Sequence, residues 1–164
     1  MEKVLTLVVK LDTSTEQSSR VNDTAQAFAS ACSWINQNVD PNLANRNSVQ
    51  AVCYRDVKSQ FGLTANHVVR ACAKVAANRQ TAKQTGLRIK GYKSTSFDCD
   101  QRTFSFREKD WAVSVSTIGK RLRLPLRASN YHQGKLSGRK PTSAQICLHG
   151  DDCWYAHIQL KSTP

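Results

Sequence analysis

The sequence predicts an α+β fold: a small antiparallel β-barrel with a three-helix insertion after its first strand. Three observations lead to this class. An apolar β-branched run opens the chain, three stretches of helical periodicity follow it, and from residue 87 onward apolar residues alternate with a period of two. With 164 residues and 40% hydrophobic side chains, the chain can bury a core without disulfide bonds, as one compact domain or two small ones.

The first predicted element is a strand at residues 3–11. Its sequence, KVLTLVVKL, is apolar on both faces over much of its length, which suits a strand packed on two sides. Residues 12–14 offer helix caps, and apolar residues then recur at helical spacing over residues 15–37. The sequence thus predicts a buried strand followed directly by a long helix.

Two further helices are predicted. One runs over residues 48–61, and the next over residues 65–85, with Thr64 as its N-cap and Gly86 at its C-terminal end. One side of this last helix is apolar, and the other side carries Arg70, Lys74, Asn78 and Thr81. The polar side is typical of a surface that contacts phosphates or base edges.

The C-terminal half is predicted to form antiparallel strands. Period-two segments occur at residues 104–106, 111–117, 121–127, 143–149 and 153–161, and the last two form a hairpin. In RLRLPLR, at 121–127, three leucines lie on one face of the predicted strand and three arginines on the opposite face. Pro125 favours an edge strand or a bulge at this position. The predicted organisation is a first barrel strand (1–13), a helical insertion (14–86) and the remaining barrel strands (87–164).

Positive charge is concentrated late in the chain. Residues 1–60 hold six basic and six acidic side chains, so residues 61–164 carry the whole formal net charge of +12. Residues 57–97 contain bases but no acid. Because sustained charge of one sign repels itself unless something neutralises it, the sequence predicts a polyanionic partner rather than a membrane surface.

Several other classes are disfavoured. No apolar run reaches the length of about 18 residues that a membrane span needs, and the acidic N-terminal segment does not read as a secretory signal. The six cysteines are spread through a chain of ordinary size, which indicates reduced cytosolic thiols. The spacing of Cys147, His149, Cys153 and His157 matches no zinc ribbon or finger. We therefore expect no metal and no cofactor.

Six segments, taken in order, carry a resemblance to a known family: LTLVVKL, ASACSWINQ, LTANHVVRACAKVAANRQ, YKSTSFDCDQRTFSF, GKRLRLPLRASNYHQGKLSG and DDCWYAHIQLK. In this order and spacing they resemble the N-terminal half of the transposon-encoded TnpB (OrfB) RNA-guided nucleases and of the compact type V CRISPR effectors derived from them. The resemblance spans essentially the whole chain, but none of these segments is a catalytic motif.

The resemblance implies a fold and a function. The first strand and the later strands would form an oligonucleotide-binding-like (OB-like) barrel called the wedge domain, and the inserted helices would form the recognition (REC) domain. The partners would be a guide RNA and target DNA, with a short DNA motif read beside the target. The implied location is the prokaryotic cytoplasm, at the nucleoid when DNA is bound.

The family's RuvC-like nuclease domain and its zinc ribbon have no counterpart in the sequence, so we expect this chain not to cut DNA by itself. Three explanations stay open. The chain is a natural split effector that works with a separate RuvC-containing chain or a second copy, a stand-alone guide-binding remnant, or an expressed fragment.

Candidate binding residues follow from charge and from the resemblance. Phosphate or RNA contacts are expected from basic residues: Arg70, Lys74, Arg79, Lys83, Lys90, Lys93, Lys120, Arg121, Arg123, Arg127, Arg139 and Lys140. The resemblance places DNA-motif reading at Tyr54, Asn66, His67, Ser94 and Ser96. No catalytic residue is expected.

Two other interpretations were weighed. A generic barrel that binds RNA or single strands without a guide would use Tyr92, Phe97 and Phe104 as stacking platforms, and it would bind unrelated RNAs equally well. An enzyme in its own right would need a nucleophile or metal constellation, and the histidines and cysteines show no recognisable spacing of that kind.

Overall fold

The computed structural model of the protein describes residues 3–86 and 91–162. The four α-helices in this part of the chain are α1 (Thr15–Asn38), α2 (Arg46–Phe61), α3 (Ala65–Thr85) and α4 (Asn130–Leu136). The seven strands are β1 (Lys3–Leu11), β2 (Ser96–Cys99), β3 (Phe104–Arg107), β4 (Ala112–Ser116), β5 (Arg121–Arg127), β6 (Ala144–Leu148) and β7 (Trp154–Ser162). A short 3-10 helix at Glu108–Asp110 lies between β3 and β4.

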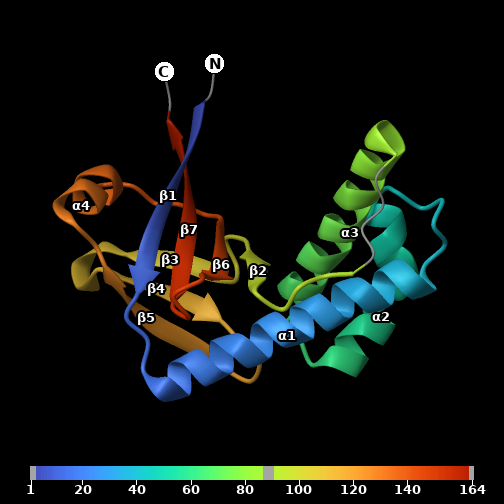
Figure 1. Ribbon diagram of the computed structural model, residues 1–164, viewed down its shortest axis with the longest axis horizontal. Coiled ribbons are helices and arrows are strands. Elements are labelled where there is room, and N and C mark those ends of the chain that lie inside the picture. The colour runs from blue at the N-terminus through green and yellow to red at the C-terminus, as the bar shows by residue number, and fades with distance from the viewer. Residues whose placement is uncertain (1–2, 87–90, 163–164) are drawn as a thin grey trace.

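The strands form one antiparallel sheet in the order β2-β6-β7-β1-β5-β4-β3, curled into a half-barrel (Figure 1). β1 pairs with β7 from Lys3 to Lys10 but with β5 only at Lys10 and Leu11. Alternate apolar side chains, such as Leu124 and Ile158, are fully buried in the core. The predicted α+β class is therefore confirmed, with a curled antiparallel sheet that is compatible with a barrel.

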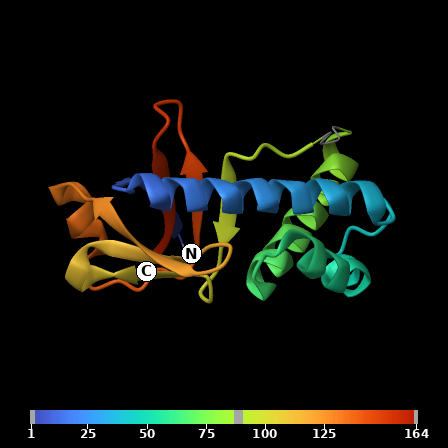
Figure 2. The same cartoon turned by 90° about the horizontal axis from the view of Figure 1, so that it is seen from below.

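The helices α1, α2 and α3 follow β1 in the chain and pack together beside the sheet (Figure 1). α1 is long enough to run past both the sheet and the other two helices (Figure 2). It is tied to the β4–β5 turn, where Arg20 Nη1 donates to the carbonyl of Ile118 over 2.9 Å and Thr24 Oγ1 accepts from the Ile118 N–H over 3.1 Å. The buried residues of the helices and the sheet consequently form one continuous core.

The helix ends follow their capping residues. α3 begins after Thr64 and ends at Gly86, as the sequence predicts. α2 begins at Arg46, two residues earlier than expected, because the Asn45 side chain accepts hydrogen bonds from two backbone N–H groups of the first turn. The short helix α4 was not predicted from the sequence.

The outer face of β1 corrects one expectation. The strand was predicted to be buried on both faces, but Val4 is 58% exposed and Val8 is 41% exposed. Only the alternate residues Leu7, Val9 and Leu11 face the core. The helices pack beside and below the half-barrel rather than over the outer face of β1 (Figure 1), so the apolar residues there stay uncovered.

β5 has a partly free edge, as Pro125 indicated. Its pairing with β1 covers only Leu126 and Arg127. The carbonyl oxygens of Pro125 and Arg123, on the same edge, accept hydrogen bonds from outside a strand. The Asp12 N–H donates to the Pro125 carbonyl over 2.7 Å, and Gln17 Nε2 donates to the Arg123 carbonyl over 3.1 Å. The N-terminal end of α1 thus takes the place of a neighbouring strand.

Candidate nucleic-acid interface

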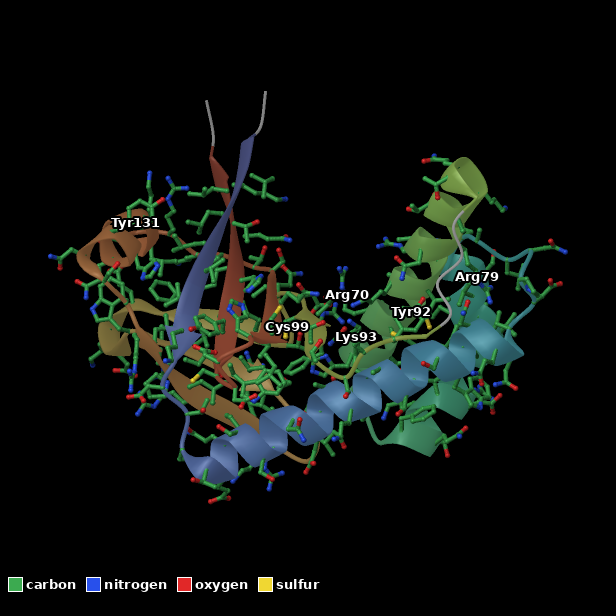
Figure 3. All side chains as sticks on the ribbon, in the orientation of Figure 1. Arg70, Arg79, Tyr92, Lys93, Cys99 and Tyr131 are labelled. Carbon is green, nitrogen blue, oxygen red and sulfur yellow. The ribbon has the colours of Figure 1, made fainter. Side chains whose placement is uncertain are left out.

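The polar side of α3 carries two half-buried cations, Arg70 and Lys74, one helical turn apart. Figure 3 shows Arg70 on the side of α3 that faces the sheet. Its Nε atom is buried and has no hydrogen-bond partner. The Lys74 ammonium lies 5.6 Å from the centroid of the Phe28 ring of α1. Burial and the Asp98 carboxylate raise the pKa of the Cys147 thiol in β6 and Lys74 opposes this rise, so both charges act on the same part of the sheet.

No described carboxylate forms an ion pair with Arg70 or Lys74. A half-buried cation loses part of its hydration, and an unpaired guanidinium N–H within the structure adds to that cost. An anionic oxygen bound beside α3 would lie within reach of both cations, because residues four apart share one face of a helix. These two residues are therefore the strongest candidates for phosphate contacts.

The segment after α3 adds a third cation. Lys93 is exposed, in the segment that leads from α3 to β2 (Figure 3). Ser94 is also exposed. Lys90, which the charge pattern also nominated, lies outside the described residues. Arg70, Lys74 and Lys93 are called the α3 cations below.

Tyr92 lines a hollow of about 430 Å³ beside α3. The hollow is also lined by Asn78, Arg79 and Lys83 of α3. Asn78 Nδ2 donates to the Tyr92 hydroxyl over 3.1 Å, and burial raises the pKa of this phenol, so the ring is held in place and stays neutral. A fixed aromatic ring next to an exposed lysine is an arrangement that can stack a base and hold its phosphate.

Arg79, which the sequence predicted to contact phosphate, makes its hydrogen bonds within the protein. Its two terminal nitrogens donate to four backbone carbonyls at the end of α1 and in the following loop, over 2.8–3.3 Å: those of Asn36, Val39, Asp40 and Leu43. The last carbonyls of a helix have no partner within the helix, and Arg79 supplies one from α3. The guanidinium is therefore committed to holding the α1–α2 loop.

The arginine side of β5 lies on the outer face of the half-barrel. Arg121 is exposed, and its guanidinium spans the neighbouring strands, with Nε donating to Ser114 over 2.6 Å and Nη1 donating to the carbonyl of Arg102 over 2.9 Å. The serines of β4, which alternate with buried residues, were not recognised from the sequence as partners of these arginines. Their period-two spacing was the signal that could have revealed them.

The other cations near β5 have acidic neighbours. The pairs are Lys120 with Glu16 at 3.9 Å, Arg123 with Asp110 at 3.9 Å, and Arg127 with Asp12 at 3.3 Å. All of these side chains are substantially exposed, so each pair contributes little to stability. They nevertheless place negative charge beside three of the four predicted phosphate-binding residues of this region.

Arg139 and Lys140 lie in the loop between α4 and β6. They line a hollow of about 410 Å³ together with Lys161 of β7. Arg139 Nη1 donates to the carbonyl of Lys161 over 3.2 Å, which holds the loop before β6 against the end of β7. The described candidates for phosphate binding thus come from three parts of the chain: α3 with the segment after it, β5 with Lys120, and the loop after α4.

The burial of His67 is at odds with the prediction that this residue reads a DNA base. The side chain is fully buried, with Nε2 2.9 Å from the carbonyl oxygen of Ser116 in β4 and its ring packed edge-on against Phe97 at 5.5 Å. Burial lowers the pKa of the imidazole, so the neutral ring is favoured. His67 joins α3 to the sheet and has no exposed edge for a base.

The other predicted motif-reading residues do not come together in one hollow. Tyr54 is half-buried on α2, where it lines a hollow with other α2 residues, whereas Ser94 lines a different hollow beside α1. Asn66 is half-buried in the first turn of α3. Ser96 Oγ is 3.5 Å from Gln145 Nε2 in the neighbouring strand. DNA-motif reading by these residues stays a prediction.

Two of the three predicted stacking residues are buried. Phe97 and Phe104 have exposed fractions of 0% and 1%, so neither ring can receive a base, and only Tyr92 remains from that set. An exposed aromatic residue that the sequence analysis missed is Tyr131 on α4, which is 58% exposed, with Lys135 Nζ 5.8 Å from its ring centroid (Figure 3). The signal was a tyrosine followed four residues later by a lysine in a polar segment.

The cysteines and histidines form no large cluster. In the part of the chain that the structure describes, all six cysteines are free, and no group of three or more histidine, cysteine or acidic residues is placed to hold a metal ion. Cys53 and Cys72 lie with their sulfur atoms 3.7 Å apart in the helical core. Within the Cys147–His157 segment, the His149 and His157 side chains are in contact, because their Nε2 atoms form a hydrogen bond.

Searches with protein-family models and against curated proteins found no match for this chain. None of the helices in residues 3–86 and 91–162 combines the length and apolarity that crossing a bilayer requires. A functional assignment consequently depends on the residues themselves, and above all on the unpaired cations of α3.

Proposed function

We propose that the protein binds RNA through the α3 cations and Tyr92. The observation that carries this proposal is the absence of any carboxylate partner for Arg70 and Lys74 among the described residues, although both are half-buried and one has an unsatisfied buried donor. Phosphate oxygens supply both the charge and the acceptors that this surface lacks. The adjacent tyrosine adds a ring for a base in an unpaired strand.

More specifically, we propose that the chain is the guide-RNA and target-DNA binding lobe of an RNA-guided DNA endonuclease of the TnpB or compact type V kind. The order of elements supports this: one strand, three helices, and then six strands of the same sheet, with the short helix α4 between β5 and β6. The sheet would be the OB-like wedge domain and α1–α3 the REC insertion. The chain would act in the prokaryotic cytoplasm without a cofactor.

In this proposal the chain is not catalytic by itself. DNA cleavage would come from a RuvC-type domain on a separate chain, and a second copy of this chain is the other candidate partner. The protein would position the scaffold RNA and the heteroduplex through phosphate contacts, and base pairing by the guide would provide the sequence specificity.

A second candidate function is a generic RNA-binding or single-strand-binding barrel. The hollow beside Tyr92 favours this alternative equally, because a stacked base of any identity fits a platform of this kind. The two candidates differ in the RNA that they retain. A guide-binding lobe selects one structured RNA, whereas a generic binder does not.

The experiment that tests the proposal is purification after co-expression with the flanking locus, followed by sequencing of bound RNA and mass spectrometry of bound protein. One defined RNA together with a RuvC-bearing protein is the expected result. One defined RNA without a partner would support a binding-only protein. A mixture of unrelated RNAs would overturn the guide proposal in favour of the generic binder, and the absence of RNA would overturn both.

A further inference from the structure

A second cluster of polar residues lies on the hairpin formed by β6 and β7, outside the surfaces described above. His149 follows β6 directly, and its N–H donates to the carbonyl of Cys153 over 3.0 Å, which closes the hairpin. His157 lies in β7, opposite Gln145 of β6. The two imidazole rings meet with their Nε2 atoms 2.8 Å apart and their planes nearly perpendicular, at 85°.

The position of His149 is fixed by neighbouring side chains. Its ring stacks on that of Tyr155, with centroids 3.7 Å apart and planes 12° from parallel. The Tyr155 hydroxyl donates to Asp151 Oδ2 over 2.6 Å, and the ammonium of Lys10 in β1 lies 3.9 Å from the same oxygen. A histidine held in this way by outer partners is a preorganised ligand, because little side-chain freedom remains to be lost on binding.

We propose that His149 and His157 form a binding site for a divalent transition-metal ion, with both Nε2 atoms as ligands. Imidazole nitrogen is a ligand that suits nickel, copper and zinc, and the remaining coordination positions would be filled by water. This inference departs from the sequence-based expectation of no metal, which considered only the spacing of four-ligand zinc sites.

The distance between the two nitrogens indicates the preferred coordination geometry. With metal–nitrogen bonds of about 2.0–2.1 Å, two nitrogens 2.8 Å apart subtend an angle of about 90° at the ion. A tetrahedral ion would need the nitrogens to be about 3.3 Å apart. At this separation a square-planar, tetragonal or octahedral ion such as Ni²⁺ or Cu²⁺ fits without movement of either ring, whereas a tetrahedral Zn²⁺ requires the two nitrogens to move apart by about 0.5 Å.

Proton balance permits this site at neutral pH. In the metal-free pair, one neutral ring donates its Nε2 proton to the lone pair of the other. When that proton moves to Nδ1 of the same ring, both Nε2 lone pairs become free for the ion. The pair can therefore bind a cation by a change of tautomer, without releasing a proton.

Nickel is the appropriate probe, because Cu²⁺ would oxidise the free thiols. Ni²⁺ binding is measured by isothermal titration calorimetry, together with the rise in melting temperature that a ligand bound only to the folded state produces. We expect one site in the wild-type protein, at least about tenfold weaker binding in both His149→Gln and His157→Gln, and loss of the thermal shift in each variant.

Two controls separate this site from other ligands. His132→Gln changes a histidine at the start of α4, where glutamine also suits the capping box, and binding should be unchanged. Cys153→Ser removes the partly exposed thiol of the same hairpin, and it should also retain the site. Equal Ni²⁺ affinity of the wild-type protein and the His149→Gln/His157→Gln double variant would overturn the proposal, as would loss of binding in Cys153→Ser alone.

Discussion

The basic residues of α3 and those of β5 are similar in the sequence but differ in the structure. Arg70 and Lys74 on α3 are half-buried and have no acidic partner among the described residues, whereas Arg123 and Arg127 on β5 are exposed and lie 3.9 Å and 3.3 Å from an aspartate. A count of positive charges would rank the two regions equally. Because Arg70 and Lys74 lack the acidic neighbours that β5 has, we expect a polyanion to bind at α3 rather than at β5, although both regions are equally basic in the sequence.

The largest expected effect follows from removing the α3 cations. The triple variant Arg70→Gln/Lys74→Gln/Lys93→Gln should bind single-stranded RNA about 100-fold more weakly at low salt, because three phosphate contacts are lost. The slope of log affinity against log salt should become shallower by about 2, at about 0.7 per contact. Fluorescence anisotropy at several salt concentrations measures both quantities.

The matched control removes three bases from the electrically balanced N-terminal part of the chain. Arg46→Gln/Arg55→Gln/Lys58→Gln lowers the net charge by the same amount on α2. If binding depends only on net charge, both triple variants will lose affinity equally, and the assignment of the interface to α3 will be wrong.

Arg79 tests whether every cation of α3 belongs to the interface. Arg79→Ala should lower the free energy of unfolding by about 2 kcal/mol, because four backbone carbonyls lose a charged donor. Urea denaturation measures this loss. In Arg79→Lys, which restores part of the hydrogen bonding, the salt slope for RNA should equal that of the wild type. A shallower slope in that variant would show that Arg79 contacts phosphate after all.

The β5 region should give a smaller effect on binding. The triple variant Arg121→Ala/Arg123→Ala/Arg127→Ala should weaken RNA binding by no more than about tenfold and make the salt slope shallower by no more than about 1. The effect is small because two of the three arginines already have carboxylate neighbours. The same anisotropy titration applies. An effect as large as that of the α3 triple variant would remove the distinction between the two regions.

The smallest expected effect concerns His67, which joins α3 to the sheet. Burial lowers the pKa of this imidazole, so below about pH 6.5 the unfolded chain binds a proton that the folded chain resists. The free energy of unfolding should therefore fall as the pH decreases from about 7 to 5, by about 1 kcal/mol.

Urea denaturation at each pH measures the contribution of His67. The variant His67→Gln should show a weaker dependence on pH, since it removes the titrating group, and His132→Gln serves as the control because that histidine is not fully buried. Parallel stability curves for the wild type and His67→Gln would contradict this role.

Local features of the fold could be predicted from the sequence. The bounds of α3 follow from Thr64 and Gly86, which act within one turn of the helix ends. The alternation in residues 121–127 gave the two faces of β5 correctly, because burial on one side of a strand imposes a period of two. In both cases the physical cause lies within a few residues of the pattern.

Features that depend on contacts between distant segments could not be predicted. The role of Arg79 depends on carbonyls about 40 positions earlier in the chain, and the burial of His67 depends on a carbonyl in β4. Residue type indicated a basic or a polar surface in both cases. Only the packing of α3 against the α1–α2 loop and the sheet shows that these two side chains point inward.

The candidate site was predictable in part for the same reason. The sequence nominated the basic residues Arg70, Lys74 and Lys93 on and after α3, yet it could not separate them from the arginines of β5. The separation depends on which carboxylates fold back against each group. Asp12 and Asp110 form ion pairs with arginines of β5, and no described acid forms an ion pair with Arg70 or Lys74.

The most direct test of the central claim is to cross-link the protein to a 4-thiouridine-labelled single-stranded RNA with ultraviolet light and to map the modified peptides by mass spectrometry. Cross-links to residues 65–85 and 91–96, with Tyr92 among the modified residues, are the predicted result. Cross-links confined to residues 104–127 would place the RNA on the outer face of β3, β4 and β5 and would contradict the account.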